Sequence, residues 1–288
     1  MLEPDRWPTL EFSLTGMSLL SGGECFVSPF PCSFPSSRVN LLEQAELDLC
    51  RGRKVDSLNW LVPNGAESFF DFVFEQAQKG LRVRGDSAAP IEAIHSGGKS
   101  WAERFPILHV SEHSTIPSRE SARPVSRFIY LNPEGEALPF ARREAESFCN
   151  LFPDARAAFR TLGEGEFNEA MADATHIYYF GHAMMVDGSP AIPARDAWIP
   201  LLSRSMGDVS RKTVFLGACL RQAGMTLRIP GGRFIYPITR IADRPNSFLE
   251  RIAGSSHLLQ GFHSACIRDA EEGDIRRFVY RVKGSIWL

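Results

Sequence analysis

The sequence predicts an α/β protein in which helices cover both faces of a mainly parallel sheet, giving a three-layer α/β/α sandwich. Several segments are apolar along their whole length, as strands buried on both faces are. Between them lie segments whose apolar residues recur at helical spacing. Such an alternation of buried strands and amphipathic helices is typical of open parallel sheets. The clearest strands are 126–131, 176–180 and 213–218, and the clearest helices are 140–152, 165–173 and 271–282.

The first half of the chain gives weaker signals. Residues 1–40 are rich in Gly, Pro and Ser, so we expect loops with a strand or two. The next expected elements are helices within 41–79, a loop at 84–100, a strand at 107–110 and an exposed connection at 111–124. We therefore divide the chain into an N-terminal segment, 1–79, packed on a second part, 80–288, whose most readable region is 125–288.

Local signals place the ends of the later elements. The strand 126–131 ends in the turn sequence Asn132-Pro133-Glu134-Gly135. The strand 176–180 is expected to stop at Gly181, and Ser247 to Glu250 has the form of a helix N-capping box. Leu258 to Phe262 is expected to be a further strand, followed by the last helix at 271–282.

Composition excludes several classes of partner. The 288 residues are 44% apolar and 23% charged, with a formal net charge of -2. That balance favours neither nucleic acid nor an anionic membrane surface. No apolar run approaches the ~20 residues that cross a bilayer. The N-terminus begins with Glu3, Asp5 and Arg6 and lacks the order of a signal peptide.

The six cysteines are scattered along the chain. None forms a pair with the spacing of a zinc site or of a compact disulfide framework. This usage predicts a reducing, cytoplasmic setting. The cysteines are Cys25, Cys32, Cys50, Cys149, Cys219 and Cys266.

Two residues with complementary chemistry follow buried strands. His182 comes two residues after Phe180, and Cys219 ends the strand that begins at Thr213. In open α/β sheets, ligands bind outside the carboxyl ends of the strands. A thiol with a pKa of about 8.5 is mostly protonated at neutral pH, and an imidazole nearby can take its proton. Spacing alone also permits a buried thiol and a turn histidine.

The two segments resemble known motifs. Residues 174–183, ATHIYYFGHA, are similar to the histidine box of CHAT domains, which are caspase- and separase-like peptidases, and 214–219, VFLGAC, resemble their cysteine box. Leu131 to Gly135, followed by Leu138-Pro139 and Glu144-Ala145, is similar to the family's opening strand, Asn-Pro turn and first helix. Pro90-Ile91-Glu92-Ala93-Ile94 and residues 262–281 are also similar to family segments. The resemblance covers about 80–285 and is densest from 125 onward.

The resemblance implies a caspase-like fold and an intracellular, bacterial cysteine endopeptidase that cuts a protein substrate. His182 is then the general base and Cys219 the nucleophile, with no cofactor and no metal. Backbone N–H groups of Ala183 and Cys219 would form the oxyanion hole. The primary specificity pocket would lie between the strand ends Asn132, Gly217 and His263. Acidic partners for a basic substrate residue would come from Asp187 and Asp269.

Some features depart from the family pattern. Gly217 replaces the usual Ser, which we expect to be harmless because both residues are small. Phe262-His263 stands where the family often has Trp-Pro, so the wall of the pocket differs. Family members are commonly controlled by a fused or partner sensor. We therefore expect control by another protein chain or by self-cleavage, with loops 111–124 and 220–233 as candidate segments.

Two alternatives to the peptidase stay open. His263 and Cys266 together with His182 and Cys219 contain the ligand types of a zinc site. A catalytically idle caspase-like domain would act as a binding or scaffold module. His176 lies within a buried strand and is expected to be a hydrogen-bonded core histidine.

Overall fold

The computed structural model describes residues 6–13, 16–28, 37–53, 66–85, 91–96, 98–110, 124–132, 138–186, 189–195, 197–200, 212–220 and 232–284. The first part contains β1 (Thr9–Ser13), β2 (Gly16–Ser21), β3 (Glu24–Val27), α1 (Ser37–Cys50), α2 (Glu67–Gln76), β4 (Leu81–Arg84), β5 (His95–Ser96), β6 (Lys99–Ser100), α3 (Trp101–Arg104) and β7 (Ile107–Val110). A 3-10 turn spans Ile91–Ala93.

The second part contains β8 (Arg127–Leu131), α4 (Pro139–Leu151), β9 (Arg156–Ala158), α5 (Glu164–Asp173), β10 (His176–Val186), β11 (Ser189–Pro193), β12 (Trp198–Pro200), β13 (Thr213–Leu220), β14 (Arg233–Pro237), α6 (Phe248–Ala253), α7 (Leu258–Glu271), α8 (Arg276–Val279) and β15 (Tyr280–Gly284). The elements expected near 107–110, 126–131, 140–152, 165–173 and 213–218 are confirmed.

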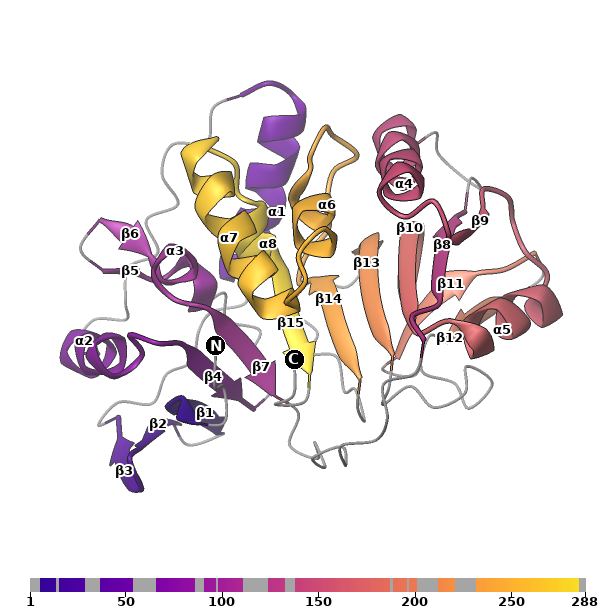
Figure 1. Cartoon of the computed structure of the whole chain (residues 1–288). Coiled ribbons are helices and arrows are strands. Elements are labelled where there is room, and N and C mark those ends of the chain that lie inside the picture. The colour runs from indigo at the N-terminus through magenta and orange to yellow at the C-terminus, as the bar shows by residue number, and fades with distance from the viewer. Residues whose placement is uncertain are drawn as a thin grey trace.

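One large sheet joins both parts of the chain (Figure 1). Its strands follow the order β9-β8-β10-β13-β14-β15-β7-β4-β1-β2-β3, and the hairpin β11–β12 continues from the end of β10. The strands from β9 to β14 are parallel to one another. Strand β15 is antiparallel to β14 and parallel to β7, and β4 and β1 continue in that second direction. The predicted α/β class with a mainly parallel sheet is confirmed.

Helices bury both faces of this sheet. Along β10, Ile177 and Tyr179 belong to a core shared with α1 and α5, whereas Tyr178 and Phe180 belong to a core shared with α4, α6 and α7. Successive side chains of a strand point to opposite faces, so a strand that is apolar at every position needs a helical layer on each side. Figure 1 shows α4, α6 and α7 on the near face of the sheet.

Two expectations about the last part of the chain were wrong. Residues 258–262 do not form a strand but begin helix α7, whose buried residues continue at helical spacing through Phe262, Cys266 and Asp269. Five apolar residues are too few to distinguish a strand from a buried helix. Of the helix expected at 271–282, only Glu271, the last residue of α7, and Arg276–Val279 are helical, and Tyr280–Gly284 is the buried strand β15.

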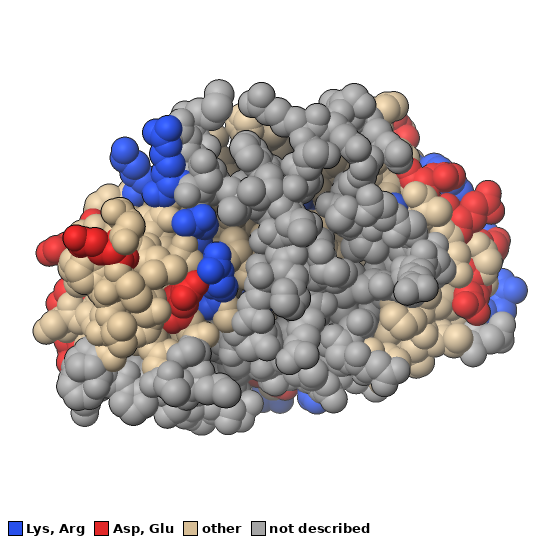
Figure 2. Space-filling model, turned by 90° about the horizontal axis from the view of Figure 1, so that it is seen from below, with Lys and Arg blue, Asp and Glu red and all other residues tan. Residues whose placement is uncertain are grey.

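The surface agrees with the small net charge. On the underside of the molecule, Lys and Arg side chains are mixed with Asp and Glu side chains at both ends of the described surface (Figure 2). Within the described ranges, no helix combines the length and the apolar character that crossing a membrane requires.

Candidate active site

A cavity of about 1320 Å³ lies at the carboxyl edge of the parallel strands. Its walls come from the start of α4, the end of α1, the hairpin β11–β12 and the loop 240–246. Both His182 and Gly217 line it. The cavity therefore lies where open α/β sheets bind their ligands.

His182 and Cys219 are partners across neighbouring parallel strands. The β10–β13 register pairs the Cα atoms of His182 and Cys219, and it continues to Ala183 and Leu220. Adjacent strands are ~4.8 Å apart, so the two backbones are next to each other. The expected adjacency of the two strand ends is confirmed. The His182 side chain is half-buried, whereas the Cys219 side chain lies outside the described part of the structure.

Gly181 lies inside β10 immediately before His182 and does not end the strand, contrary to expectation. Its φ is +138°, and an added Cβ would lie 2.8 Å from the hydroxyl of Tyr179 and 3.1 Å from the carbonyl oxygen of Asn132. Only glycine tolerates this combination of backbone conformation and space. The hydroxyl of Tyr179 donates a hydrogen bond to the His182 carbonyl. Glycine and tyrosine together therefore determine the position of the His182 backbone.

Gly217 is small because a neighbour occupies the space of its side chain. Gly217 is the Cα partner of Phe180, and an added Cβ would lie 2.7 Å from the Phe180 ring and 3.3 Å from Leu249. The phenylalanine is fully buried and cannot move into solvent. A serine at 217 would therefore require Phe180 or the strand to shift in this chain.

Asn132 is a structural residue at the end of β8. Its side-chain amide donates to the carbonyl of Pro193 at 2.7 Å and its side-chain oxygen accepts from Thr161 at 3.3 Å. Only 1% of Asn132 is exposed. These contacts attach the end of β11, which forms one wall of the cavity, to the parallel sheet.

His263 and Asp269 lie on α7 and line no part of this cavity. His263 is half-buried, and burial lowers the pKa of its imidazole. Asp269 accepts hydrogen bonds from the backbone and guanidinium of Arg277 at 3.0 and 3.3 Å, and burial raises its pKa to about 7. His263 and Asp269 were expected beside the end of a strand at 258–262, and because these residues form helix α7 instead, neither side chain lies at a strand end. Asp187 lies outside the described residues.

The cavity contains acidic and aromatic residues that the sequence patterns did not indicate. Asp243 accepts hydrogen bonds from the backbone N–H groups of Phe140 and Ala141 at 3.2 and 2.8 Å, so it caps α4. Glu144 on α4 is half-buried, and burial raises its pKa to about 7. Trp198 on β12 is 38% exposed. Asp243 lies about one hundred positions after the helix it caps, and no local pattern reports such a contact.

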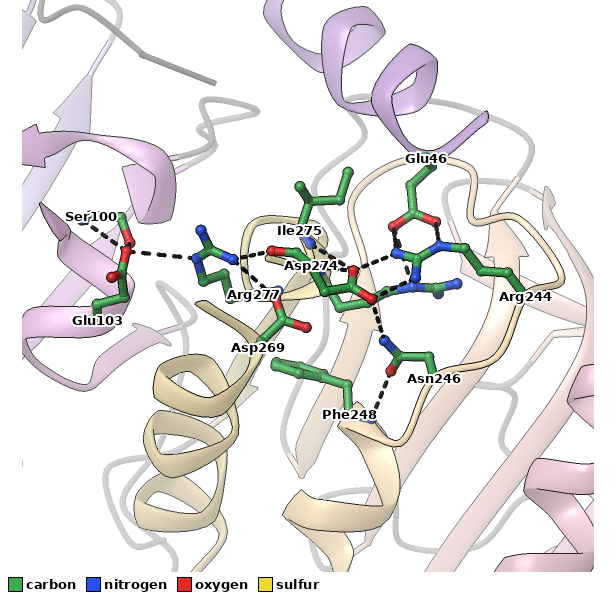
Figure 3. A network of polar contacts seen from close by, with 11 residues as sticks. Glu46, Ser100, Glu103, Arg244, Asn246, Phe248, Asp269, Asp274, Ile275 and Arg277 are labelled. Atoms are coloured by element: carbon green, nitrogen blue, oxygen red, sulfur yellow. Dashed lines mark hydrogen bonds and ion pairs between the residues drawn. The ribbon is translucent and has the colours of Figure 1, made fainter. Parts of the chain in front are cut away.

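A buried ionic network holds α1 and the loop 240–246 beside the cavity (Figure 3). Glu46 of α1 accepts hydrogen bonds from the guanidinium of Arg244 at 3.1 and 3.0 Å, and Arg244 also pairs with Asp274. Asn246 in the same loop donates to Asp274 and accepts from the backbone N–H of Phe248 at 2.6 Å. Asn246 therefore caps α6, whereas the Ser247 side chain makes no capping hydrogen bond.

The described thiols differ in accessibility. Cys25 and Cys50 are exposed, and Cys50 lines the cavity at the end of α1. Cys266 is buried and Cys149 half-buried, and burial raises the pKa of both thiols. A thiol with a raised pKa holds less of the reactive thiolate. Within the described ranges, no three histidine, cysteine or acidic side chains cluster as a metal site.

Comparisons with known proteins complete the description. No protein-family model matches the chain, and no curated protein matches it. Among solved structures, the chain is similar to the Arg-specific cysteine proteinase gingipain R (RGPB), with a TM-score of 0.47 and 11% sequence identity. The similarity covers 84% of this chain and 73% of that chain.

Proposed function

We propose that this chain is a caspase-like cysteine endopeptidase of the CHAT type, with Cys219 as nucleophile and His182 as general base. The observation that carries the proposal is the register of β10 and β13, which pairs the Cα atoms of these two residues at the edge of a large cavity. Proton transfer between an imidazole and a thiol requires this kind of proximity.

In the proposed reaction, His182 takes the thiol proton of Cys219, and the thiolate attacks a peptide carbonyl carbon. The tetrahedral oxyanion is held by the backbone N–H groups of Ala183 and Cys219. His182 then gives the proton to the leaving amine as the C–N bond breaks, which leaves an acyl-enzyme. Water, deprotonated by His182, hydrolyses the thioester and regenerates the thiol. Loss of one oxyanion donor typically costs ~10²–10³ in rate.

The proposed substrate is a protein segment bound in the cavity. Trp198 and Leu47 are 38% and 40% exposed and supply apolar contact area in the cavity wall. Glu144 and Asp243 supply carboxyl groups, whereas Arg240 supplies a cation. A mixed lining of this kind suits an extended peptide. We further propose that a regulatory protein or self-cleavage controls the activity, in a cytoplasmic setting.

Site-resolved labelling with an acyloxymethylketone probe tests the proposal. We expect stoichiometric modification of Cys219, measured by peptide mass spectrometry. The modification should be abolished in Cys219→Ala and strongly slowed in His182→Ala. The exposed Cys50 provides a matched comparison, because its thiol lines the same cavity without a histidine partner in strand register. Cys50→Ser is expected to leave labelling of Cys219 unchanged.

Equal and slow labelling of Cys219, Cys50 and Cys25 would refute the enzyme and favour an idle binding module. If Cys219 is selectively labelled, a peptide library digested by the purified chain identifies the cleaved bond. Cleavage must then disappear in Cys219→Ala.

A further inference from the structure

The parallel strands begin, at the edge opposite the candidate active site, with a row of two arginines, a histidine and a threonine. Arg127, His176, Thr213 and Arg233 are the first residues of β8, β10, β13 and β14. The strand register pairs His176 with Arg127 and with Thr213, and Thr213 with Arg233. We call these four residues the strand-start row. They occupy one level across four neighbouring strands.

The four side chains lie on one face of the sheet. The residue after each of them belongs to the core shared with α1 and α5, and Tyr178 and Phe215, one position further, belong to the opposite core. Because side chains alternate along a strand, the strand-start row faces the layer of α4, α6 and α7. There the row lines a cavity of about 250 Å³ together with Phe152 and the turn Ser255-Ser256-His257.

The cations of this cavity are incompletely neutralised. Arg233 is half-buried, burial lowers its pKa, and its guanidinium has no hydrogen bond or ion pair within the described ranges. Arg127 pairs with Asp154 at 3.3 Å, but 67% of the Asp154 side chain is exposed. The Nε of Arg127 is buried without a hydrogen-bond partner. A half-buried guanidinium without an anionic partner is available to bind an anion beside it.

The remaining groups around the cavity also favour an anion. Burial, Arg127 and Arg233 together lower the pKa of His176 to about 4, so its imidazole is neutral near pH 7. Helix α7 begins at this wall, and its N-cap residue, His257, makes no capping hydrogen bond with its side chain. The first N–H groups of a helix are free to bind an anion. Thr213 and Ser256 add hydroxyl groups to the cavity wall, whereas the Ser255 hydroxyl donates to the His257 carbonyl at 3.0 Å.

We propose that this cavity binds a phosphate group, either as inorganic phosphate or as the terminal group of a small phosphomonoester. Two guanidinium groups from separate strands, hydroxyl donors and a helix N-terminus match the several oxygens of a phosphate. The volume admits the phosphate and a few further atoms. The site lies at the opposite end of the strands from His182, so it is independent of the proposed peptidase activity.

Calorimetric titration with inorganic phosphate and with glycerol 3-phosphate, against potassium chloride of equal ionic strength, tests the site. Saturable binding to the wild-type chain is expected, and the tighter of the two ligands shows whether free or esterified phosphate is preferred. Arg233→Gln is expected to weaken binding about 10- to 100-fold, the usual worth of a charged hydrogen bond. Arg142→Gln is the matched control, because Arg142 is exposed on α4 and lies outside the cavity.

A second measurement uses the wild-type chain, so it stands if Arg233→Gln fails to fold. The titration midpoint of the His176 ring resonance, identified with His176→Gln and followed from pH 3 to pH 7, is expected to rise when phosphate is added. The anion would raise the pKa of an imidazole that shares the cavity with Arg127, Arg233, Tyr178 and His257 and whose Nδ1 is 3.1 Å from the Thr175 hydroxyl. Three results would each overturn the proposal. They are the absence of saturable binding below about 10 mM phosphate, equal phosphate affinity in the wild type and Arg233→Gln, and a His176 titration that phosphate does not change.

Discussion

Glu46→Gln is expected to be among the most destabilising single changes outside the apolar core. The Glu46 carboxylate is 1% exposed and is shared by Arg244 at 3.0 Å and Arg276 at 3.2 Å. After substitution Arg244 still pairs with Asp274, but Arg276, only 4% exposed, loses its ion-pair partner. Leaving a buried charge without its partner typically costs 3–5 kcal/mol. For a chain of this length that corresponds to a Tm lowered by roughly 6–10 °C.

Differential scanning calorimetry measures this change, with Glu43→Gln as the matched control. Glu43 lies one turn earlier on α1 and pairs at 3.4 Å with Arg240, whose side chain is 56% exposed. Such a surface pair contributes about 0–1 kcal/mol, so the control should lose little stability. Replacing Arg276 by Met in the Glu46→Gln background should recover part of the loss. Equal Tm values for the two single variants would contradict the assignment of a buried, shared carboxylate.

Three further predictions concern Gly217, Glu144 and the buried His109, whose Nε2 lies 2.6 Å from the Glu92 carboxylate. Gly217→Ala should destabilise the chain by about 1–3 kcal/mol, because the new methyl group lies 2.7 Å from the Phe180 ring. The control Gly165→Ala, with open space around residue 165, should stabilise the chain by up to about 1 kcal/mol. Comparable chemical-denaturation midpoints for the two variants would reject the steric reason. The raised pKa of Glu144 means that its stabilising contribution is present at acid pH and is lost as pH rises from about 4.5 to about 7. Glu144→Gln should therefore lose less stability than the wild type between pH 5 and pH 8. Identical losses in both proteins would contradict the raised pKa of Glu144. Burial and Arg281 lower the pKa of His109 to about 4, so stability is lost as pH falls from about 6.5 to about 4. In His109→Gln, whose amide can still donate to Glu92, the free energy of unfolding measured with urea should depend less on pH over that range. An unchanged pH dependence would show that His109 does not titrate there.

The local sequence was sufficient to predict the parallel half of the sheet and its edge. Strands β8, β10 and β13 are apolar along their central residues, as strands are that helices cover on both faces. His182 and Cys219 follow two such strands and were expected at one edge of the sheet, and the strand register agrees. The catalytic roles of these two residues stay predictions.

Only the tertiary structure decided which distant segments meet. Helix α7 and strand β15 were misread because a short buried apolar run satisfies both helical and extended patterns, and the neighbouring layers select between them. The space at Gly217 depends on the Phe180 ring across the sheet, and the cap of α4 comes from Asp243. The strand-start row exists because strand register aligns four residues that are scattered along the chain. Such contacts depend on packing in three dimensions, which leaves no periodic trace in the sequence.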